Sequence, residues 1–126
     1  MLPTTRLWTT LAALGGFLAV AVGAFAAHAV GDPQAKDWLR LGAQYGFMHS
    51  LAVFAAVFVL ERGARLARLA PGLFLLGQVF FCGSLYGMAL GGPRVLGAIT
   101  PIGGLLFLAG WALLALACAR ARTPQA

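Results

Sequence analysis

The fold of this chain is decided by the stretch LWTTLAALGGFLAVAVGAFAAHAV, residues 7–30, which contains no Asp, Glu, Lys or Arg. A helix rises about 1.5 Å per residue, so the stretch is long enough to cross a lipid core of about 30 Å with some tilt. Its Ala24-Phe25-Ala26 end has the pattern of a signal-peptide cleavage site, but a signal peptide has a shorter apolar core of roughly 7–15 residues. The stretch is therefore predicted to be a retained transmembrane helix.

The composition of the whole chain also indicates a protein embedded in lipid. Of its 126 residues, 61% are hydrophobic and 10% are charged. Soluble domains have about 25% charged residues, and a chain this short cannot bury so much apolar surface away from water. We therefore expect an all-α polytopic membrane protein with a single membrane domain over residues 1–126.

Three further apolar runs predict three more helices. Gly31-Asp32-Pro33 joins a good N-cap residue to a proline suited to the first helical position, so a second helix is expected to begin at Pro33. Its first turns are amphipathic and are expected to lie in the membrane interface, with Trp38 in the aromatic belt, before residues 41–60 span. Short connections then predict four antiparallel helices. Their approximate ranges are residues 7–30, 33–61, 71–91 and 101–119, followed by a polar tail from Arg120 to Ala126.

The basic residues lie at the ends of the apolar runs. Nine Lys and Arg against three acids give a net charge of +6, which in a soluble protein would suggest a nucleic-acid partner. Here we expect membrane lipids instead and no nucleic acid, with Arg62, Arg65 and Arg68 facing anionic headgroups. The membrane side with both termini and the connection after the second helix has six basic residues, and the opposite side has three. The positive-inside rule therefore predicts a multi-pass protein of the plasma (inner) membrane with both termini cytoplasmic.

Small residues recur along the helices at spacings that favour close helix packing. Lipid is as apolar as Leu, so transmembrane helices associate where small side chains let their backbones approach. The pattern fits contacts within one chain, in a homo-oligomer, or with partner membrane proteins. The glycines predicted to pack are Gly15, Gly23, Gly42, Gly46, Gly83, Gly87 and Gly91.

Polar side chains at membrane depth are costly, so each is a candidate for function. Most of them fall in the predicted non-cytoplasmic half, where Tyr45 and His49 on the second helix lie level with Tyr86 and Cys82 on the third. These two faces are expected to meet around a polar pocket, unless the same groups only form interhelical hydrogen bonds. The candidate pocket residues are His28, Gln44, Tyr45, His49, Gln78, Cys82, Ser84, Tyr86 and Thr100.

More specific chemistry finds little support in the sequence. A proton-coupled transporter usually needs a carboxylate at depth, but all three acids lie at helix ends. His28 and His49 differ in depth, which disfavours a haem held by two histidines. With Cys82 they match no metal-binding spacing, and a Cys82–His49 nucleophile pair has no orienting third group. We predict no catalytic residue, no metal and no cofactor.

Several short motifs together resemble one family. The stretch from Gly23 to Ala29 is similar to its Gly-Ala-Phe-Gly-Ala-His-Ala motif, with Ala26 in place of glycine. Further matching segments follow in the other three helices, and they cover nearly the whole chain. These are Trp38, Ala43-Gln44-Tyr45, His49-Ser50-Leu51, Gly83-Ser84-Leu85-Tyr86, Ile99-Thr100-Pro101-Ile102-Gly103-Gly104 and Gly110-Trp111. The family is that of the small membrane proteins grouped as domain of unknown function 423, related to eukaryotic transmembrane protein 256.

The resemblance implies a four-helix inner-membrane protein and no particular activity. Cys82 stands where the family more often has serine, which weakens any chemistry that depends on this thiol. We therefore expect a non-enzymatic binding or scaffolding protein, which binds a lipid, a small molecule or partner helices through its polar half. The alternatives are a small oligomeric transporter or channel, which needs a water-filled path, and a metal or redox accessory protein, which would carry bound metal or colour.

Overall fold

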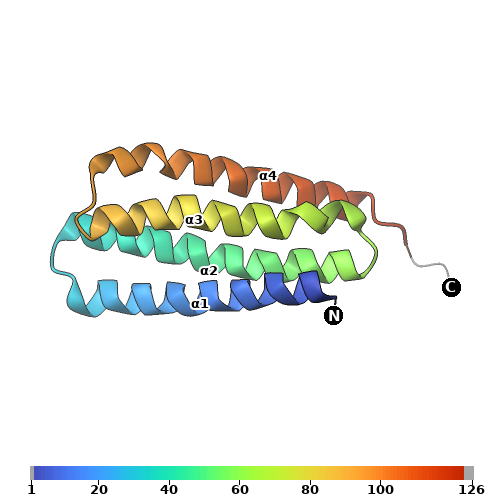
Figure 1. Cartoon of the computed structure of the whole chain (residues 1–126), viewed down its shortest axis with the longest axis horizontal. Coiled ribbons are helices and arrows are strands. Elements are labelled where there is room, and N and C mark those ends of the chain that lie inside the picture. Colours follow the sequence, from blue (N-terminus) through green and yellow to red (C-terminus); the bar gives the residue numbers. More distant parts are fainter. Residues whose placement is uncertain (1, 124–126) are drawn as a thin grey trace.

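The computed structural model describes residues 2–123 as four long helices and two short 3-10 helices. The chain runs back and forth along one axis, so consecutive long helices point in opposite directions (Figure 1). The long helices are α1 (Pro3–Ala29), α2 (Pro33–Glu61), α3 (Ala70–Ala89) and α4 (Thr100–Ala119), and the 3-10 helices are η1 (Arg65–Leu69) and η2 (Arg94–Ala98). Residues 124–126 of the expected polar tail lie outside the described residues.

The prediction of an all-α fold with four membrane-spanning helices is confirmed. Each of the four segments is long and apolar enough to cross a membrane. The first helix starts at Pro3 rather than Leu7, and proline suits the first helical position because the N–H that it lacks would have no partner there. The Oγ1 atoms of Thr5 and Thr10 donate to the carbonyl oxygens of Leu2 and Arg6 at 2.9 and 2.8 Å. The interfacial location of the first turns of α2 stays a prediction.

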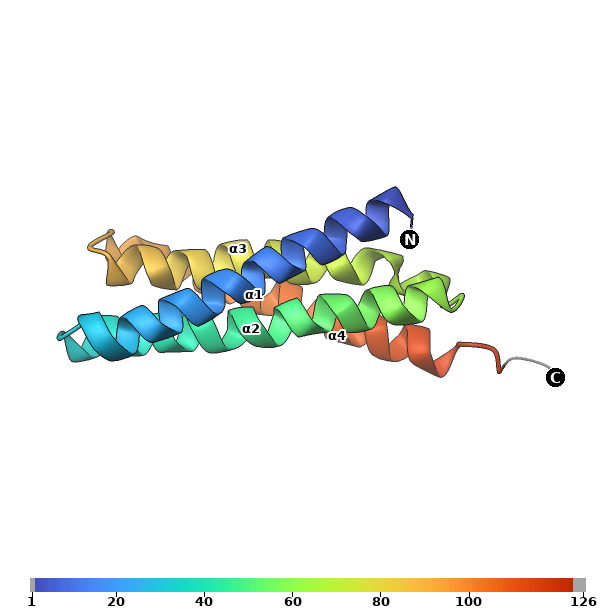
Figure 2. The same cartoon turned by 90° about the horizontal axis from the view of Figure 1, so that it is seen from below.

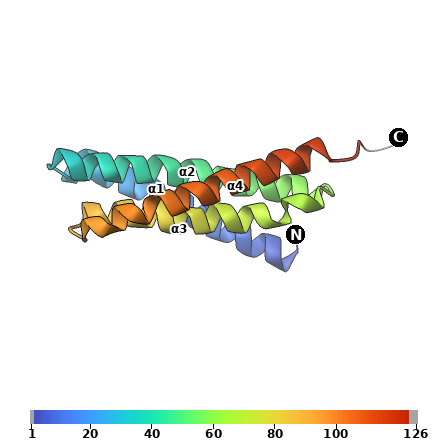
Figure 3. The same cartoon turned by 90° about the horizontal axis from the view of Figure 1, so that it is seen from above.

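The helices pack in the order α1–α2–α3–α4 rather than in a closed ring. α2 and α3 lie side by side in the middle, α1 packs mainly against α2, and α4 packs mainly against α3. Figure 2 shows α1 crossing this central pair obliquely from one side, and Figure 3 shows α4 crossing from the other side. As a result, α1 and α3 have few direct contacts, and the same is true of α2 and α4.

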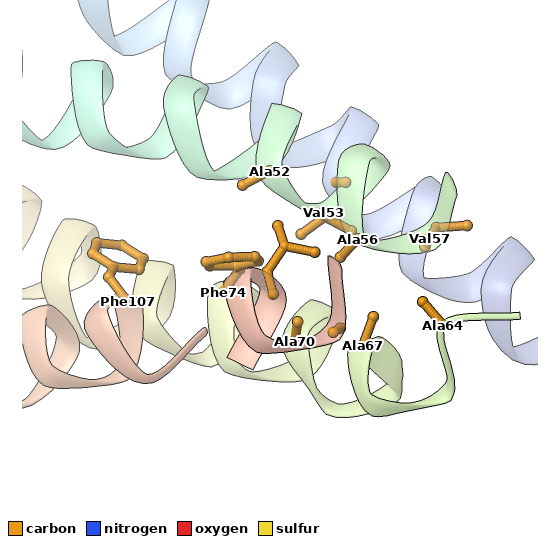
Figure 4. Packing of buried hydrophobic residues seen from close by; sticks show 12 residues of the cluster. Ala52, Val53, Ala56, Val57, Ala64, Ala67, Ala70, Phe74 and Phe107 are labelled. Atoms are coloured by element: carbon orange, nitrogen blue, oxygen red, sulfur yellow. The ribbon is translucent and has the colours of Figure 1, made fainter. Parts of the chain in front are cut away.

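The hydrophobic core is built mostly from small side chains. Ala52, Val53 and Ala56 of α2 face Ala70 and Phe74 of α3, and η1 closes this end of the bundle (Figure 4). Such small residues let helix backbones approach closely, which is the main source of helix association in lipid.

Glycines of α3 and α4 accommodate aromatic rings of the opposite helix. A Cβ atom on Gly110 would lie 2.6 Å from the Phe74 ring, and one on Gly77 would lie 2.6 Å from the Phe107 ring. A Cβ atom on Gly103 would meet the backbone nitrogen of Phe81. The sequence did not predict these contacts, because the three glycines do not form a four-residue ladder.

Five of the seven glycines predicted to pack have close neighbours in other segments. They are Gly15, Gly23, Gly42, Gly46 and Gly87. The other two have no neighbour within 4 Å of a built Cβ atom among the described residues, so their part in helix packing stays a prediction. Gly83 is exposed on α3. Gly91 has a φ of 96° in the turn after α3, a conformation that favours glycine.

The N-cap predicted at Asp32 is confirmed. Its Oδ2 atom accepts a hydrogen bond from the backbone N–H of Ala35 at 2.8 Å. We expect Asp32→Ala to lower the free energy of unfolding by about 1 kcal/mol, because an N–H at the start of α2 loses its acceptor. Unfolding in mixed micelles measures this change. The control is Asp37→Ala, at an exposed position one turn later, which should change stability by less than about 0.5 kcal/mol. Equal losses would contradict a capping role.

Candidate functional site

A groove of about 380 Å³ runs between α1 and α3. Its walls are mainly apolar and include Leu11 and Leu18 of α1 and Leu75 and Val79 of α3, while α2 contributes Gly46. Val79 is 64% exposed, so the groove opens sideways, toward what is lipid in a membrane. Its volume falls in the range of about 300–1,000 Å³ that small-molecule sites occupy.

Gln78 is the main polar group of this groove. Its side chain is 9% exposed, and its Oε1 atom accepts a hydrogen bond from Ser50 Oγ of α2 at 3.4 Å. Its Nε2 atom is buried and has no hydrogen-bond partner among the described residues. A buried donor without a partner costs about 1–3 kcal/mol. Gln78 thus lines the groove and carries a buried amide donor that has no partner among the described residues.

The missing side chain of Gly15 makes room for this polar pair. A Cβ atom there would lie 2.7 Å from Ser50 Oγ and 3.0 Å from Gln78 Oε1. Gly15 is thus the reason that two polar groups of α2 and α3 can lie directly against the backbone of α1.

Tyr86 joins this groove to a second hollow. Its ring packs against Gly42 of α2, where a Cβ atom would lie 2.5 Å from Tyr86 Cε1. The second hollow, of about 430 Å³, shares Leu18 and Tyr86 with the groove and continues to Phe25 and Leu90. The two hollows thus adjoin at Leu18 and Tyr86, and we refer to them together as the slot.

His49 lies outside this slot, in an aromatic cluster between α2, α3 and α4. It is 2% exposed, and its ring stacks on Phe107 with a centroid distance of 3.5 Å. Trp111 Nε1–H donates to His49 Nε2 at 3.1 Å, so Nε2 is an acceptor and the proton resides on Nδ1. The Nδ1–H group then donates to the carbonyl oxygen of Tyr45 at 2.7 Å. Neither ring nitrogen is free for a metal or a substrate.

Sequence reasoning missed Trp111 and Phe107 as partners of His49. A tryptophan within an apolar span carries an N–H that needs an acceptor, because lipid offers none. That requirement was the available signal. Phe107 gave no comparable signal, since phenylalanine is ordinary in an apolar helix.

Two further candidates bond each other where α4 begins. Ser84 and Thr100 are linked through their hydroxyl oxygens at 2.6 Å, and Ser84 Oγ also lies 3.0 Å from the carbonyl oxygen of Phe81. The first bond joins the start of α4 to α3, whereas the second lies within α3.

The nine predicted pocket residues therefore do not form one pocket. Gln78, Cys82 and Tyr86 line the groove, whereas Tyr45 and His49 turn toward α4. The polar stripe of α2 is wide enough to contact two neighbours, so one part faces α3 and another faces α4. Two of the predicted residues, His28 and Gln44, are exposed and lie outside the groove.

Cys82 and His49, which the sequence offered as a nucleophile pair, have different neighbours. Cys82 lies in the groove, but His49 bonds to Tyr45 and Trp111 and so is not placed to act as a base for it. Within residues 2–123, no three His, Cys, Asp or Glu side chains form a group that could hold a metal ion.

Comparison with known proteins finds one family model and several relatives that match this chain. Residues 22–104 match the family model described as "Protein of unknown function (DUF423)". The UPF0382 membrane protein of Haemophilus influenzae is 43% identical over 111 residues, which cover 86% of this chain and 90% of the relative. The UPF0382 inner membrane protein YgdD of Escherichia coli K12 is 38% identical over 115 residues, 88% of each chain. A Staphylococcus epidermidis UPF0382 membrane protein is 36% identical over 115 residues, 89% of this chain and 94% of its own. No solved structure matches the chain significantly.

Proposed function

Since the chain belongs to the DUF423 family of membrane proteins, whose function is unknown, we propose a function from its structure. It is a non-enzymatic integral membrane protein that binds an apolar, membrane-dissolved molecule in the groove between α1 and α3. The observation that carries this proposal is the buried Nε2 atom of Gln78, which lacks a partner at the groove.

The walls of the groove define the body of the ligand. Apolar side chains of α1 and α3 form most of the lining, and the opening faces lipid. A ligand can therefore enter sideways from the bilayer without crossing water. The second hollow, which adjoins the groove at Leu18 and Tyr86, favours an elongated molecule over a compact one.

Gln78 defines the polar part of the ligand. An N–H donor requires an acceptor oxygen, such as that of a carbonyl group. Gln78 is the ninth residue of α3, so it lies about 12 Å along the helix from its start, near the middle of the bilayer. Phospholipid ester groups lie near the interface, so the expected ligand carries its carbonyl within or at the tip of a long apolar body.

The distribution of basic residues supports a cellular location. Both termini and the connection after α2, which together carry most of the arginines, lie at the same end of the bundle (Figure 1). The positive-inside rule favours the cytoplasm for that end. The Escherichia coli relative is named an inner membrane protein. We propose the inner membrane, with both termini cytoplasmic, as the location of this chain.

A matched pair of glutamine variants tests the groove. Native mass spectrometry of the protein released from membranes in mild detergent should show a recurrent apolar mass on the wild type. Gln78→Leu should raise the dissociation constant about tenfold and so lower the occupied fraction, the effect of about 1.4 kcal/mol from one lost hydrogen bond. Gln44→Leu, at an exposed position on α2, should keep the ligand.

The stability of a double variant separates ligand binding from a structural role. Gln78→Leu alone leaves the buried Ser50 hydroxyl without its acceptor, so it is combined with Ser50→Ala. Replacing both partners of a hydrogen bond by apolar groups is nearly neutral or stabilising. The double variant should therefore keep or raise the thermal stability while it loses the ligand. A lower stability with unchanged ligand would show that Gln78 only joins helices. A bare wild-type protein would also contradict the proposed function.

A further inference from the structure

A separate hollow of about 330 Å³ lies at the end of the bundle where α2 and α4 finish. Arg62 and Arg65 line it from the connection after α2, and Arg120 and Arg122 line it from the segment after α4. The hollow thus combines residues that are far apart in the sequence. Arg68, which the sequence grouped with Arg62 and Arg65, is not part of the lining.

The fold explains why these four arginines meet. α2 ends at Glu61, and Gly63 turns the chain with a φ of 98°, a conformation that favours glycine. The 3-10 helix η1 then packs against α4. Ala64 and Ala117, whose small side chains are buried, also line the hollow.

One of these guanidinium groups is held in place by an aromatic ring. Arg62 Cζ lies 4.1 Å from the centroid of the Phe58 ring. Such a cation–π contact contributes about 0.5–1 kcal/mol at an exposed site. It reduces the freedom of Arg62, which also lines the hollow.

The charge of the hollow is not balanced by acids. None of the acidic side chains in the described chain lines it. Asp32 and Asp37 belong to the opposite end of α2, and Glu61 accepts a hydrogen bond from Thr5 Oγ1 of α1 at 3.3 Å. Four positive charges therefore surround a space that holds no negative side chain.

We propose that this hollow is a binding site for a phosphate group. Guanidinium groups match phosphate oxygens with paired N–H donors, and several around one cavity favour a ligand with more than one negative charge. The hollow lies where the helices end, at the depth of lipid headgroups, and basic pockets between transmembrane helices bind such groups. The phosphate belongs either to an anionic phospholipid or to a soluble molecule. This proposal is independent of the groove at Gln78.

Two double variants with equal charge test the site. The first, Arg120→Gln with Arg122→Gln, removes half of the hollow. The second, Arg6→Gln with Arg68→Gln, removes two exposed arginines that do not line it. All four positions are exposed, so both variants are expected to fold, and circular dichroism with thermal unfolding checks this.

The lipid arm uses vesicles of phosphatidylcholine with 10% cardiolipin, followed by stepwise delipidation and native mass spectrometry. The wild type and the Arg6/Arg68 variant should retain a cardiolipin molecule at detergent levels that strip phosphatidylcholine. The Arg120/Arg122 variant should retain it about tenfold less, since charge-assisted hydrogen bonds are the strong ones.

The soluble arm titrates inorganic pyrophosphate into lipid-free protein in detergent. If the wild type binds pyrophosphate but retains no cardiolipin, and the Arg120/Arg122 variant does not bind pyrophosphate, the result supports the same site. The ligand is then a soluble phosphate. Equal losses in the two double variants would show general charge attraction and overturn the proposal. Retention of both ligands by the Arg120/Arg122 variant would overturn it as well.

Discussion

Gly103→Ala is expected to lower the free energy of unfolding by about 2 kcal/mol, within the usual range of about 1–3 kcal/mol for overpacked sites. The added Cβ atom would meet the backbone nitrogen of Phe81 and would lie 2.8 Å from the carbonyl oxygen of Gly77. Both are backbone atoms of α3, so no side-chain rotation relieves the contact. The helices α3 and α4 must separate along their shared face.

The adjacent Gly104 supplies the control. A Cβ atom there has no neighbour within 4 Å, and alanine is favoured over glycine in a helix by up to about 1 kcal/mol. Gly104→Ala should therefore be neutral or stabilising in the same unfolding experiment in mixed micelles. If the two alanine variants unfolded alike, the close α3–α4 contact would be absent in the membrane protein.

His49→Ala is expected to lower the free energy of unfolding by about 3 kcal/mol, comparable to other large-to-small changes in packed cores. The substitution removes the ring that stacks on Phe107 and leaves a cavity between α2 and α4. It also leaves the N–H of Trp111 without its acceptor. The occupancy of the groove at Gln78 should stay unchanged, because His49 does not line it.

Trp111→Phe separates the hydrogen bond from the packing. Phenylalanine keeps an aromatic ring beside Phe74 and His49 but cannot donate to Nε2. We expect a smaller loss of about 1 kcal/mol, since a single hydrogen bond in a membrane contributes about 0.6 kcal/mol on average.

Loss of the groove ligand in His49→Ala at full stability would instead place His49 in the binding site.

Local signals in the sequence predict most of the fold. Residues 7–30 must be a spanning helix because no soluble fold of this size could bury them. Asp32 and Pro33 predict the start of α2 because capping depends on adjacent residues. Such features need no knowledge of the neighbouring helices, and the structure agrees with them.

The partners of each polar residue could not be predicted in this way. Tyr45 and His49 share a helix face with Gly42 and Gly46, yet the first pair faces Phe107 and the second faces Tyr86. That division depends on the crossing of α1 and α4 over the central pair, which periodicity does not encode. The same is true of Arg120 and Arg122, which meet Arg62 only through the packing of η1 on α4.

Site-specific photocrosslinking in native membranes tests the central claim, that the groove between α1 and α3 holds a specific apolar ligand. A benzophenone amino acid replaces Val79, which is 64% exposed at the groove, or Leu108, which is 66% exposed on α4. We expect one recurrent, carbonyl-bearing adduct mass at position 79 that Gln78→Leu removes, and only mixed phospholipid adducts at position 108. The same mixed phospholipids at both positions would contradict the claim and leave the groove as an ordinary lipid-filled surface.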